Sequence, residues 1–347
     1  MIDRGSVKRI LIIKPRATGD VVLSTIVTRN LRAAFPDATI HFLTERASAD
    51  LLHGHPYVDG LVVFDRRTMS ALDLIRVVRR NAYDCVFDLF GNPRTALLTL
   101  MSGARYRVGY RFRGRSYAYN ILATPRGGEV HNTQFNLDAL IAAGIPVIDR
   151  RLHIRVPEEA ARFAREYLQT AVPDARPIVA FATGGGWYTK RWGLDRYSEL
   201  GDRIVESFGA AILLPWGPGE RDDAERLRER MRNAPLIPPP STLPQLAALL
   251  RECRAVVSND SGPLHIAASV GTPVLGIYGP TNPRLQGPYG EGHRTVRREG
   301  LDCLGCNLTR CPIGLKCMLD LDVDTVFAAF EHLMRDTSRG VRTHEQE

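Results

Sequence analysis

Short apolar runs alternate with amphipathic segments along this chain of 347 residues, and this alternation restricts the fold more than any other feature of the sequence. Residues 9–13 (RILII) are predicted to form a buried strand, and residues 21–35 carry apolar side chains at helical spacing up to Pro36, which ends the helix. Further strands are predicted at 39–43, 61–64 and 84–89, with a helix at 71–81. This order is typical of a parallel sheet with helices on both faces.

The same alternation resumes after a polar connection near residues 150–159. Residues 103–129, rich in Gly, Arg and Tyr, are predicted to be irregular, and a helix follows at 134–143. The second half has predicted helices at 158–169, 195–208, 221–232, 243–251 and 263–270, and strands at 178–182, 211–214, 255–258 and 274–278. We therefore predict two doubly wound α/β domains, residues 1–155 and 156–335, and a polar tail at 336–347. Ligands bind such sheets at the carboxyl ends of the strands, so we expect the domains to face one interdomain cleft.

The charge balance favours anionic partners. The net charge is +8, and 42 of the 46 basic residues are arginine. Phosphates, nucleic acid and an acidic membrane surface all fit this balance, which does not choose among them. No uninterrupted apolar run reaches the roughly 18 residues of a membrane span, and six cysteines are too few for a disulfide scaffold. We expect a cytoplasmic protein.

The first candidate loop follows the strand at 9–13 and contains Thr18, Gly19 and Asp20. Glycine permits a tight turn here, and a carboxylate fixed on a strand-to-helix turn is suited to act as a general base. Asp20 equally fits the cap of the following helix, where a negative charge is favourable. The spacing alone leaves both interpretations open.

The second candidate loop follows the strand at 178–182. Gly184, Gly185 and Gly186 let backbone amides approach a phosphate closely, and Lys190 is one of only four lysines in the chain. The loop matches neither the P-loop nor the GxGxxG pattern, which disfavours an NTPase or a dehydrogenase. A flexible glycine hinge with a solvated lysine is the structural alternative.

The third candidate loop follows the strand at 255–258 and contains Asp260, Ser261, Gly262 and His265. Pro263 suits the first turn of a helix, whose free amides can bind a pyrophosphate. The alternative is a capped helix in which His265 only packs.

Together these segments resemble glycosyltransferase family 9, the heptosyltransferases of lipopolysaccharide core assembly. The resemblance covers nearly the whole chain and is carried by Gly19-Asp20-Val21-Val22, Lys190-Arg191-Trp192, Trp216-Gly217 with Glu220, the run from Asn259 to His265, Gly279-Pro280-Thr281 and the segment ending Cys317-Met318. It implies a GT-B architecture, in which two Rossmann-like domains hold the acceptor in the N-terminal half and the nucleotide sugar in the C-terminal half.

The resemblance also implies residue roles. Asp20 resembles the catalytic base, Lys190 the phosphate-binding lysine, and Glu220 the residue near the nucleotide ribose. Asp260, Ser261, Gly262 and His265 resemble donor-site residues, while Thr18 and Gly19 fall on the acceptor side. The run Gly184 to Gly186 departs from the more polar stretch of some members, so only its backbone contacts carry over.

The implied reaction is inverting transfer of heptose from ADP-heptose to an anionic glycolipid, a lipopolysaccharide core precursor, at the cytoplasmic face of the inner membrane. Lys190 and the helix amides compensate the departing diphosphate, so the chemistry requires no metal. Two alternatives remain: a sugar-nucleotide epimerase on a similar scaffold, and a non-catalytic anion- or nucleotide-binding protein.

An arginine-rich segment lies in the predicted acceptor domain. Arg111 and Arg113 are interleaved with aromatic residues, and arginine forks match phosphate and carboxylate groups, so we assign them, with His131, to acceptor binding. A solvated basic edge is the structural alternative. Nucleic acid is not favoured, because no recognised binding motif accompanies the charge.

Four cysteines form a compact set with the spacing C-x2-C-x4-C-x5-C, at Cys303, Cys306, Cys311 and Cys317. This spacing suits a structural zinc or iron site, and reduced thiols packed in a loop are the alternative. Disulfides are disfavoured in the cytosol.

Overall fold

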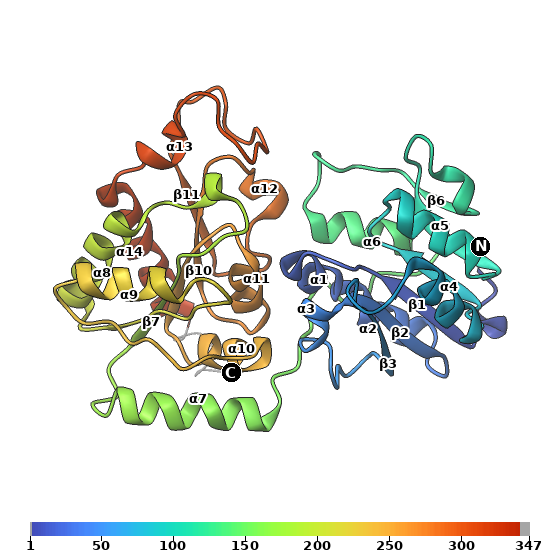
Figure 1. Ribbon diagram of the computed structural model, residues 1–347, viewed down its shortest axis with the longest axis horizontal. Helices are drawn as coiled ribbons and strands as arrows, with labels where there is room; N and C mark the ends of the chain where they lie inside the picture. The colour runs from blue at the N-terminus through green and yellow to red at the C-terminus, as the bar shows by residue number, and fades with distance from the viewer. Residues whose placement is uncertain (1, 341–347) are drawn as a thin grey trace. The chain divides into compact units, whose positions relative to one another are not determined.

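The computed structural model describes the backbone of residues 2–340 and the side chains of residues 2–336. The chain divides into two compact units, Met1–Arg155 and Val156–Glu347. Each unit contains one sheet whose strand pairs are all parallel, with helices on both faces (Figure 1). The predicted α/β class is therefore confirmed in each unit.

The first unit has a six-stranded sheet in the order β3-β2-β1-β4-β5-β6. Its strands are β1 (Arg9–Ile13), β2 (Thr39–Glu45), β3 (Gly60–Phe64), β4 (Cys85–Asp88), β5 (Tyr106–Tyr110) and β6 (Ile121–Ala123). Its helices are α1 (Thr18–Ser24), α2 (Ile26–Ala34), α3 (Arg46–Ala49), α4 (Ala71–Arg80), α5 (Pro93–Met101) and α6 (Asn132–Ala142), with 3-10 turns η1 (Arg4–Ser6) and η2 (Ser116–Ala118). The strand order reverses between β1 and β4, which is where ligands bind doubly wound sheets.

The prediction of one helix at residues 21–35 is wrong, because the structure breaks it at Thr25. The amide of Thr25 donates to the carbonyl of Val22, three residues back, at 3.0 Å. The hydroxyls of Ser24 and Thr25 donate to the carbonyls of Val21 and Val22, each at 2.7 Å. These short-range bonds replace the regular α-helical pattern and separate α1 from α2.

The prediction that residues 103–129 are irregular is also wrong in part, because the segment contributes β5 and β6 to the sheet. Only Val108, Gly109 and Tyr110 are buried in β5, and β6 has three residues. The arginines and tyrosines between these short stretches hide the strand pattern.

The second unit has a five-stranded sheet in the order β11-β10-β9-β7-β8, which reverses between β7 and β9. Its strands are β7 (Ile178–Ala182), β8 (Ala211–Leu213), β9 (Ala255–Asn259), β10 (Val274–Tyr278) and β11 (Arg294–Arg297). Its helices are α7 (Glu158–Ala171), α8 (Leu194–Phe208), α9 (Arg221–Arg230), α10 (Leu243–Arg251), α11 (Gly262–Ser269), α12 (Pro283–Gln286), α13 (Lys316–Leu319) and α14 (Val323–Gly340), with the 3-10 turn η3 (Tyr188–Lys190). Every residue of β7, β9 and β10 is buried, as expected for central parallel strands.

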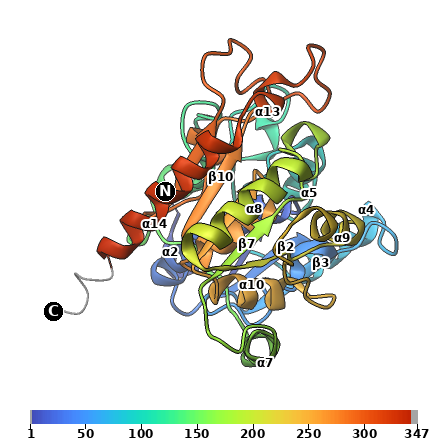
Figure 2. The same cartoon turned by 90° about the vertical axis from the view of Figure 1, so that its left-hand side faces the viewer.

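Helices cover both faces of this second sheet. Helices α8 and α14 pack together on one side (Figure 2), and α7, α10 and α11 pack together on the other. The predicted polar tail at 336–347 begins inside α14, and residues 341–347 lie outside the described residues. Among residues 2–340, no helix combines the length and the apolar character needed to cross a bilayer.

Candidate functional site

The first unit places the loop with Asp20 where its strand order reverses. This loop connects β1 to α1, and the loop after the neighbouring β4 lies beside it. Asp20 occupies the third position of α1, and its carboxylate accepts the amide of Ala17 at 3.3 Å. The capping role considered from the sequence is thus present, and it holds the carboxylate at the carboxyl edge of the sheet.

Lys14 joins the two loops at this edge, a role that the sequence analysis missed. Its side chain is buried, and Nζ donates to the carbonyl of Leu89, after β4, at 3.1 Å. Burial lowers the pKa of Lys14, while the negative charges of Asp20 and Asp88 act in the opposite direction. A lone lysine at the end of a strand, in a chain with 42 arginines, was the signal that could have identified it.

Asp88, the last residue of β4, is a second polar group that sequence reasoning missed. It is fully buried, accepts the amide of Gly91 at 2.9 Å and accepts the hydroxyl of Tyr119 at 2.7 Å. Burial raises the pKa of Asp88 above its ordinary value. Asp88 therefore fixes the loop after β4 from within.

The remaining residues assigned to the acceptor lie along the same edge. Arg111 and Arg113 follow β5 and are exposed, and His131 precedes α6. His131 also caps that helix, because its Nδ1 accepts the amide of Thr133 at 3.2 Å. The hydroxyl of Thr18 contacts that of Ser48 at 3.1 Å, and Gly19 is buried in α1.

The second unit brings its two candidate loops together where β7 and β9 adjoin. Asn259, the last residue of β9, donates from Nδ2 to the carbonyl of Thr183 at 2.7 Å and to that of Gly184 at 3.3 Å. Its Oδ1 accepts the amide of Trp192 at 3.3 Å and the hydroxyl of Tyr197 at 3.1 Å. One buried amide side chain therefore ties the glycine loop to the loop that begins at Asp260.

Lys190 forms an ion pair across these loops. Its Nζ lies 2.7 Å from Oδ2 of Asp260, and the two side chains are 15% and 6% exposed. Nζ also lies 4.4 Å from the centre of the Trp187 ring. The solvated lysine considered from the sequence is thus excluded, because the ammonium is held between a carboxylate and an aromatic face.

Gly184 is packed against Glu220. The carboxylate of Glu220 accepts the amide of Gly217 at 2.9 Å, and a Cβ placed on Gly184 would collide with its Oε1. Around Gly186, by contrast, no atom lies within 4 Å of such a Cβ. A Cβ on Gly184 would displace the Glu220 carboxylate, so the glycine lets Glu220 lie directly against the glycine loop.

Helix α11 begins in the same loop. Ser261 is its N-cap residue, Gly262 its first residue, and Pro263 occupies its first turn. His265 is buried one turn further along. The Ser261 side chain makes no capping bond to the helix, and its hydroxyl lies 3.3 Å from that of Ser258. The helix start therefore keeps amides directed at the carboxyl edge of the sheet, where they favour an anion.

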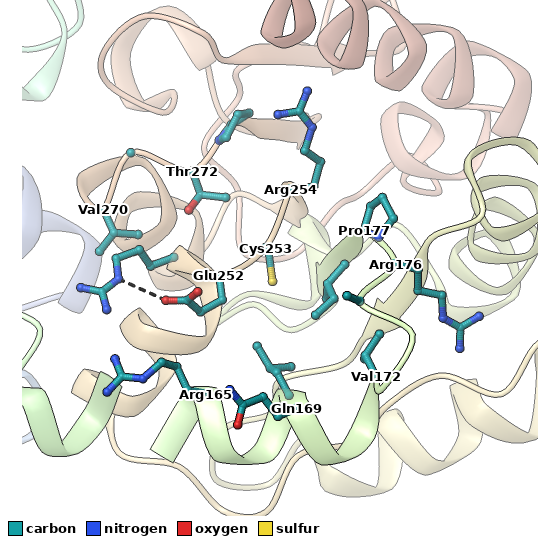
Figure 3. A pocket seen from close by; sticks show the side chains of 16 residues that line it. Arg165, Gln169, Val172, Arg176, Pro177, Glu252, Cys253, Arg254, Val270 and Thr272 are labelled. Atoms are coloured by element: carbon teal, nitrogen blue, oxygen red, sulfur yellow. Dashed lines mark ion pairs between the residues drawn. The ribbon is translucent and has the colours of Figure 1, made fainter. Parts of the chain in front are cut away.

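A cavity of about 730 Å³ lies at the opposite edge of this sheet (Figure 3). Its lining includes Arg165, Arg176 and Arg254, residues just before β7, β9 and β10, and the ends of α7, α10 and α11. Helix C-termini disfavour anions, and the arginines there compensate the partial negative charge. This cavity contains none of the predicted site residues.

The four clustered cysteines line one cavity of about 60 Å³. All are free thiols, and burial, reinforced by the other three cysteines, raises the pKa of Cys317 to about 11. Sγ of Cys311 accepts the amide of Leu315 at 3.2 Å. Within the described part of the chain, no three His, Cys, Asp or Glu side chains are arranged to hold a metal ion.

The cysteine loop also supports the candidate donor loops. The amides of Gly305 and Asn307 donate to the carbonyls of Gly279 and Pro280 at 3.1 and 2.7 Å. The hydroxyl of Thr189, beside Lys190, donates to the carbonyl of Leu308 at 2.9 Å.

Comparison with known proteins identifies the family of this chain. The model of glycosyltransferase family 9 (heptosyltransferase) matches residues 71–315. Lipopolysaccharide heptosyltransferase 1 of Pseudomonas aeruginosa is 30% identical over 87% of each chain. The crystal structure of a family 9 glycosyltransferase from Veillonella parvula has a TM-score of 0.83 at 24% identity and covers 95% of this chain and 97% of its own.

The E. coli heptosyltransferase WaaC, solved with ADP-2-deoxy-2-fluoro heptose, has a TM-score of 0.71 at 21% identity and covers 93% of this chain and 99% of its own. These neighbours confirm the predicted GT-B type of fold. The family match spans well over half of the chain and the Pseudomonas relative covers most of it. The chain therefore belongs to glycosyltransferase family 9, and it is a glycosyltransferase.

Proposed function

We propose that this enzyme transfers heptose from ADP-heptose to a lipopolysaccharide core acceptor, with inversion at the anomeric carbon. The observation that carries the proposal is the ion pair of Lys190 with Asp260 beside the start of α11, at the carboxyl edge of the second sheet. The Pseudomonas relative, named as a lipopolysaccharide heptosyltransferase, and the neighbour solved with an ADP-heptose analogue support the choice of substrates.

The second unit, residues 156–335, serves the donor in this proposal. Departure of ADP puts negative charge on its terminal phosphate as the bond from the anomeric carbon to the phosphate oxygen breaks. The ammonium of Lys190 and the amides at Ser261 and Gly262 stabilise that charge. Glu220 accepts a hydrogen bond from a ribose hydroxyl. The backbone of Gly184, Gly185 and Gly186 approaches the phosphates closely. Asp260 and His265 complete the donor pocket.

The first unit, residues 1–155, serves the acceptor. Asp20 takes the proton of the acceptor hydroxyl while the acceptor oxygen forms its bond to the anomeric carbon, on the face opposite the departing ADP. Arg111, Arg113 and His131 bind the anionic groups of the acceptor, and Thr18 and Gly19 shape the loop beside the reacting hydroxyl. The reaction runs without a catalytic metal, at the cytoplasmic face of the inner membrane.

The test compares wild type with Asp20→Asn, which preserves size and removes the base. We expect turnover of ADP-heptose with a core acceptor to fall by about 10²- to 10⁴-fold, while calorimetry shows unchanged binding of ADP. Product stereochemistry by NMR reports inversion. Normal turnover by the variant would show that Asp20 is not the catalytic base. Conversion of the donor without any acceptor would instead indicate an epimerase, and nucleotide binding without turnover on any acceptor a non-catalytic binding protein.

We further propose that Cys303, Cys306, Cys311 and Cys317 hold a structural zinc or iron ion. Their spacing and their shared cavity support this, and the thiols must converge for binding because no ready ligand set exists among residues 2–336. Metal analysis of purified enzyme should find one equivalent, which Cys303→Ser and Cys317→Ser lose. Six titratable thiols with no metal in wild type would overturn the proposal.

A further inference from the structure

An apolar, basic surface of the first unit has no part in the chemistry described above. Helix α5 runs beside η2 near β5 and β6 (Figure 1). Along the outer side of α5, Leu97, Leu100 and Met101 are 46%, 37% and 38% exposed, and Tyr117 of η2 is 60% exposed. A surface helix normally turns a polar stripe to water, so α5 reverses the usual pattern.

The charged residues in the stretch of sequence that contains this stripe all have one sign. Residues 89–128 contain seven arginines and no aspartate or glutamate. Within the part of the chain that the structure describes, Arg126 pairs with Asp138, whereas Arg94 and Arg105 have no ion pair with a carboxylate. Arg94 lies on α5 itself, and Arg105 follows its end. The apolar stripe is therefore flanked by cations that no acidic side chain neutralises.

We propose that this surface, formed by Arg94, Leu97, Leu100, Met101, Arg105 and Tyr117, docks the enzyme on a bilayer that contains anionic lipids. Leucine and methionine side chains gain free energy in the acyl boundary, tyrosine suits the headgroup level, and arginine attracts anionic headgroups. A nucleic acid or an acidic peptide would match the arginines but would leave the apolar stripe exposed to water. The proposal deepens the proposed function, because it rests on an acceptor that is itself a lipid.

The experiment is co-sedimentation of the full chain with vesicles, without any nucleotide sugar. We expect wild type to bind vesicles of phosphatidylcholine and phosphatidylglycerol in equal parts and not to bind vesicles of phosphatidylcholine alone. The bound protein should dissociate as the salt concentration rises. Arg94→Ser/Arg105→Ser should bind about 25-fold more weakly, at about fivefold for each arginine near an anionic surface. Leu97→Ser/Leu100→Ser/Met101→Ser should bind at least about tenfold more weakly.

The matched control is Leu319→Ser/Arg226→Ser, which removes a 49% exposed leucine and an exposed arginine from the second unit and should bind as wild type does. Melting curves identify any variant that fails to fold; if the triple variant does, Leu97→Ser alone, at a 46% exposed position, replaces it. Vesicle binding unchanged in the triple leucine and methionine variant, or equal loss in the control, would overturn the proposal. Loss in the arginine variant alone would indicate a polyanion as the partner and overturn it too.

Transfer to a deacylated, water-soluble core acceptor separates this inference from the proposed function. The docking variants should keep the wild-type rate on that acceptor, because none of the changed residues is assigned to substrate. If wild type itself fails to transfer heptose, the proposed function is wrong, whereas the vesicle result stands by itself.

Discussion

Replacing Lys190 with methionine tests the centre of the donor site, because the change removes a charge and keeps the length of the side chain. In wild type the ammonium lies 2.7 Å from the Asp260 carboxylate, which is only 6% exposed. Lys190→Met therefore leaves a buried carboxylate without its cation. The change should affect stability and turnover through separate causes.

The stability effect follows from burial. Removing one partner of a buried ion pair costs about 3 to 5 kcal/mol, and the 15% exposure of Lys190 favours the lower end. For a unit of this size, about 3 kcal/mol corresponds to a fall of roughly 6 to 12 °C in the melting temperature. Turnover should fall by about 10²- to 10³-fold, because the ammonium no longer stabilises the departing diphosphate.

A second change separates the two effects. Lys190→Met/Asp260→Asn replaces the stranded carboxylate by a neutral group of the same size, so the melting temperature should recover most of its loss. Turnover should remain low, since the charge that stabilises the diphosphate is still missing. Differential scanning calorimetry and steady-state transfer assays give the two readouts. A wild-type melting temperature in Lys190→Met, or restored turnover in the double variant, would refute the reasoning.

Two further variants test local packing. Gly184→Ala should weaken ADP binding by calorimetry and lower the melting temperature, because the new Cβ meets the Glu220 carboxylate, whereas Gly186→Ala adds its Cβ in open space and should melt as wild type does. Asp149→Asn should lower the free energy of unfolding at pH 7 by about 2 kcal/mol, since it weakens charged hydrogen bonds to Arg29 at 3.0 Å, Arg151 at 3.1 Å and His153 at 2.7 Å. Burial alone would raise the pKa of Asp149, but these bonds outweigh burial and hold the pKa below its ordinary value. The difference in the free energy of unfolding between wild type and variant should therefore persist above about pH 4 and shrink as the pH falls further. Urea unfolding at several pH values measures it, and a difference that grows on acidification would contradict the argument.

The central strands were predictable because each is a continuous apolar run. Strands β1, β7 and β10 have the predicted bounds, residues 9–13, 178–182 and 274–278. The edge strands β6 and β11 were not predicted, because each buries little, whereas the edge strands β3 and β8 were predicted at 61–64 and 211–214. In β11, Val296 is the buried residue among four, and a run of that composition carries no strand signal.

Helix α5 was missed for a related reason. Its sequence, PRTALLTLM, is apolar around most of its circumference, so it lacks the contrast between faces that identifies a helix. The exposed Leu97 and Leu100 that hide the helix from sequence analysis are the same side chains that make its outer surface apolar.

In the candidate site too, the sequence pattern predicts some residues, whereas the roles of others become visible only from the packing. Loops after strands predicted where Asp20, Lys190 and Asp260 lie, because the carboxyl ends of parallel strands share one edge. The roles of the residues that hold those loops in place were not predicted, because a single polar residue at the end of a strand barely changes the apolar pattern of that strand. Lys14 spans the two loops at the reversal of strand order in the first unit, and Asn259 does the same in the second. An unpaired buried carbonyl costs about 1 to 3 kcal/mol, so each of these side chains sets its loops more firmly than solvent-exposed contacts do. The chemistry proposed for each edge therefore depends on a buried residue to which the proposal assigns no substrate contact.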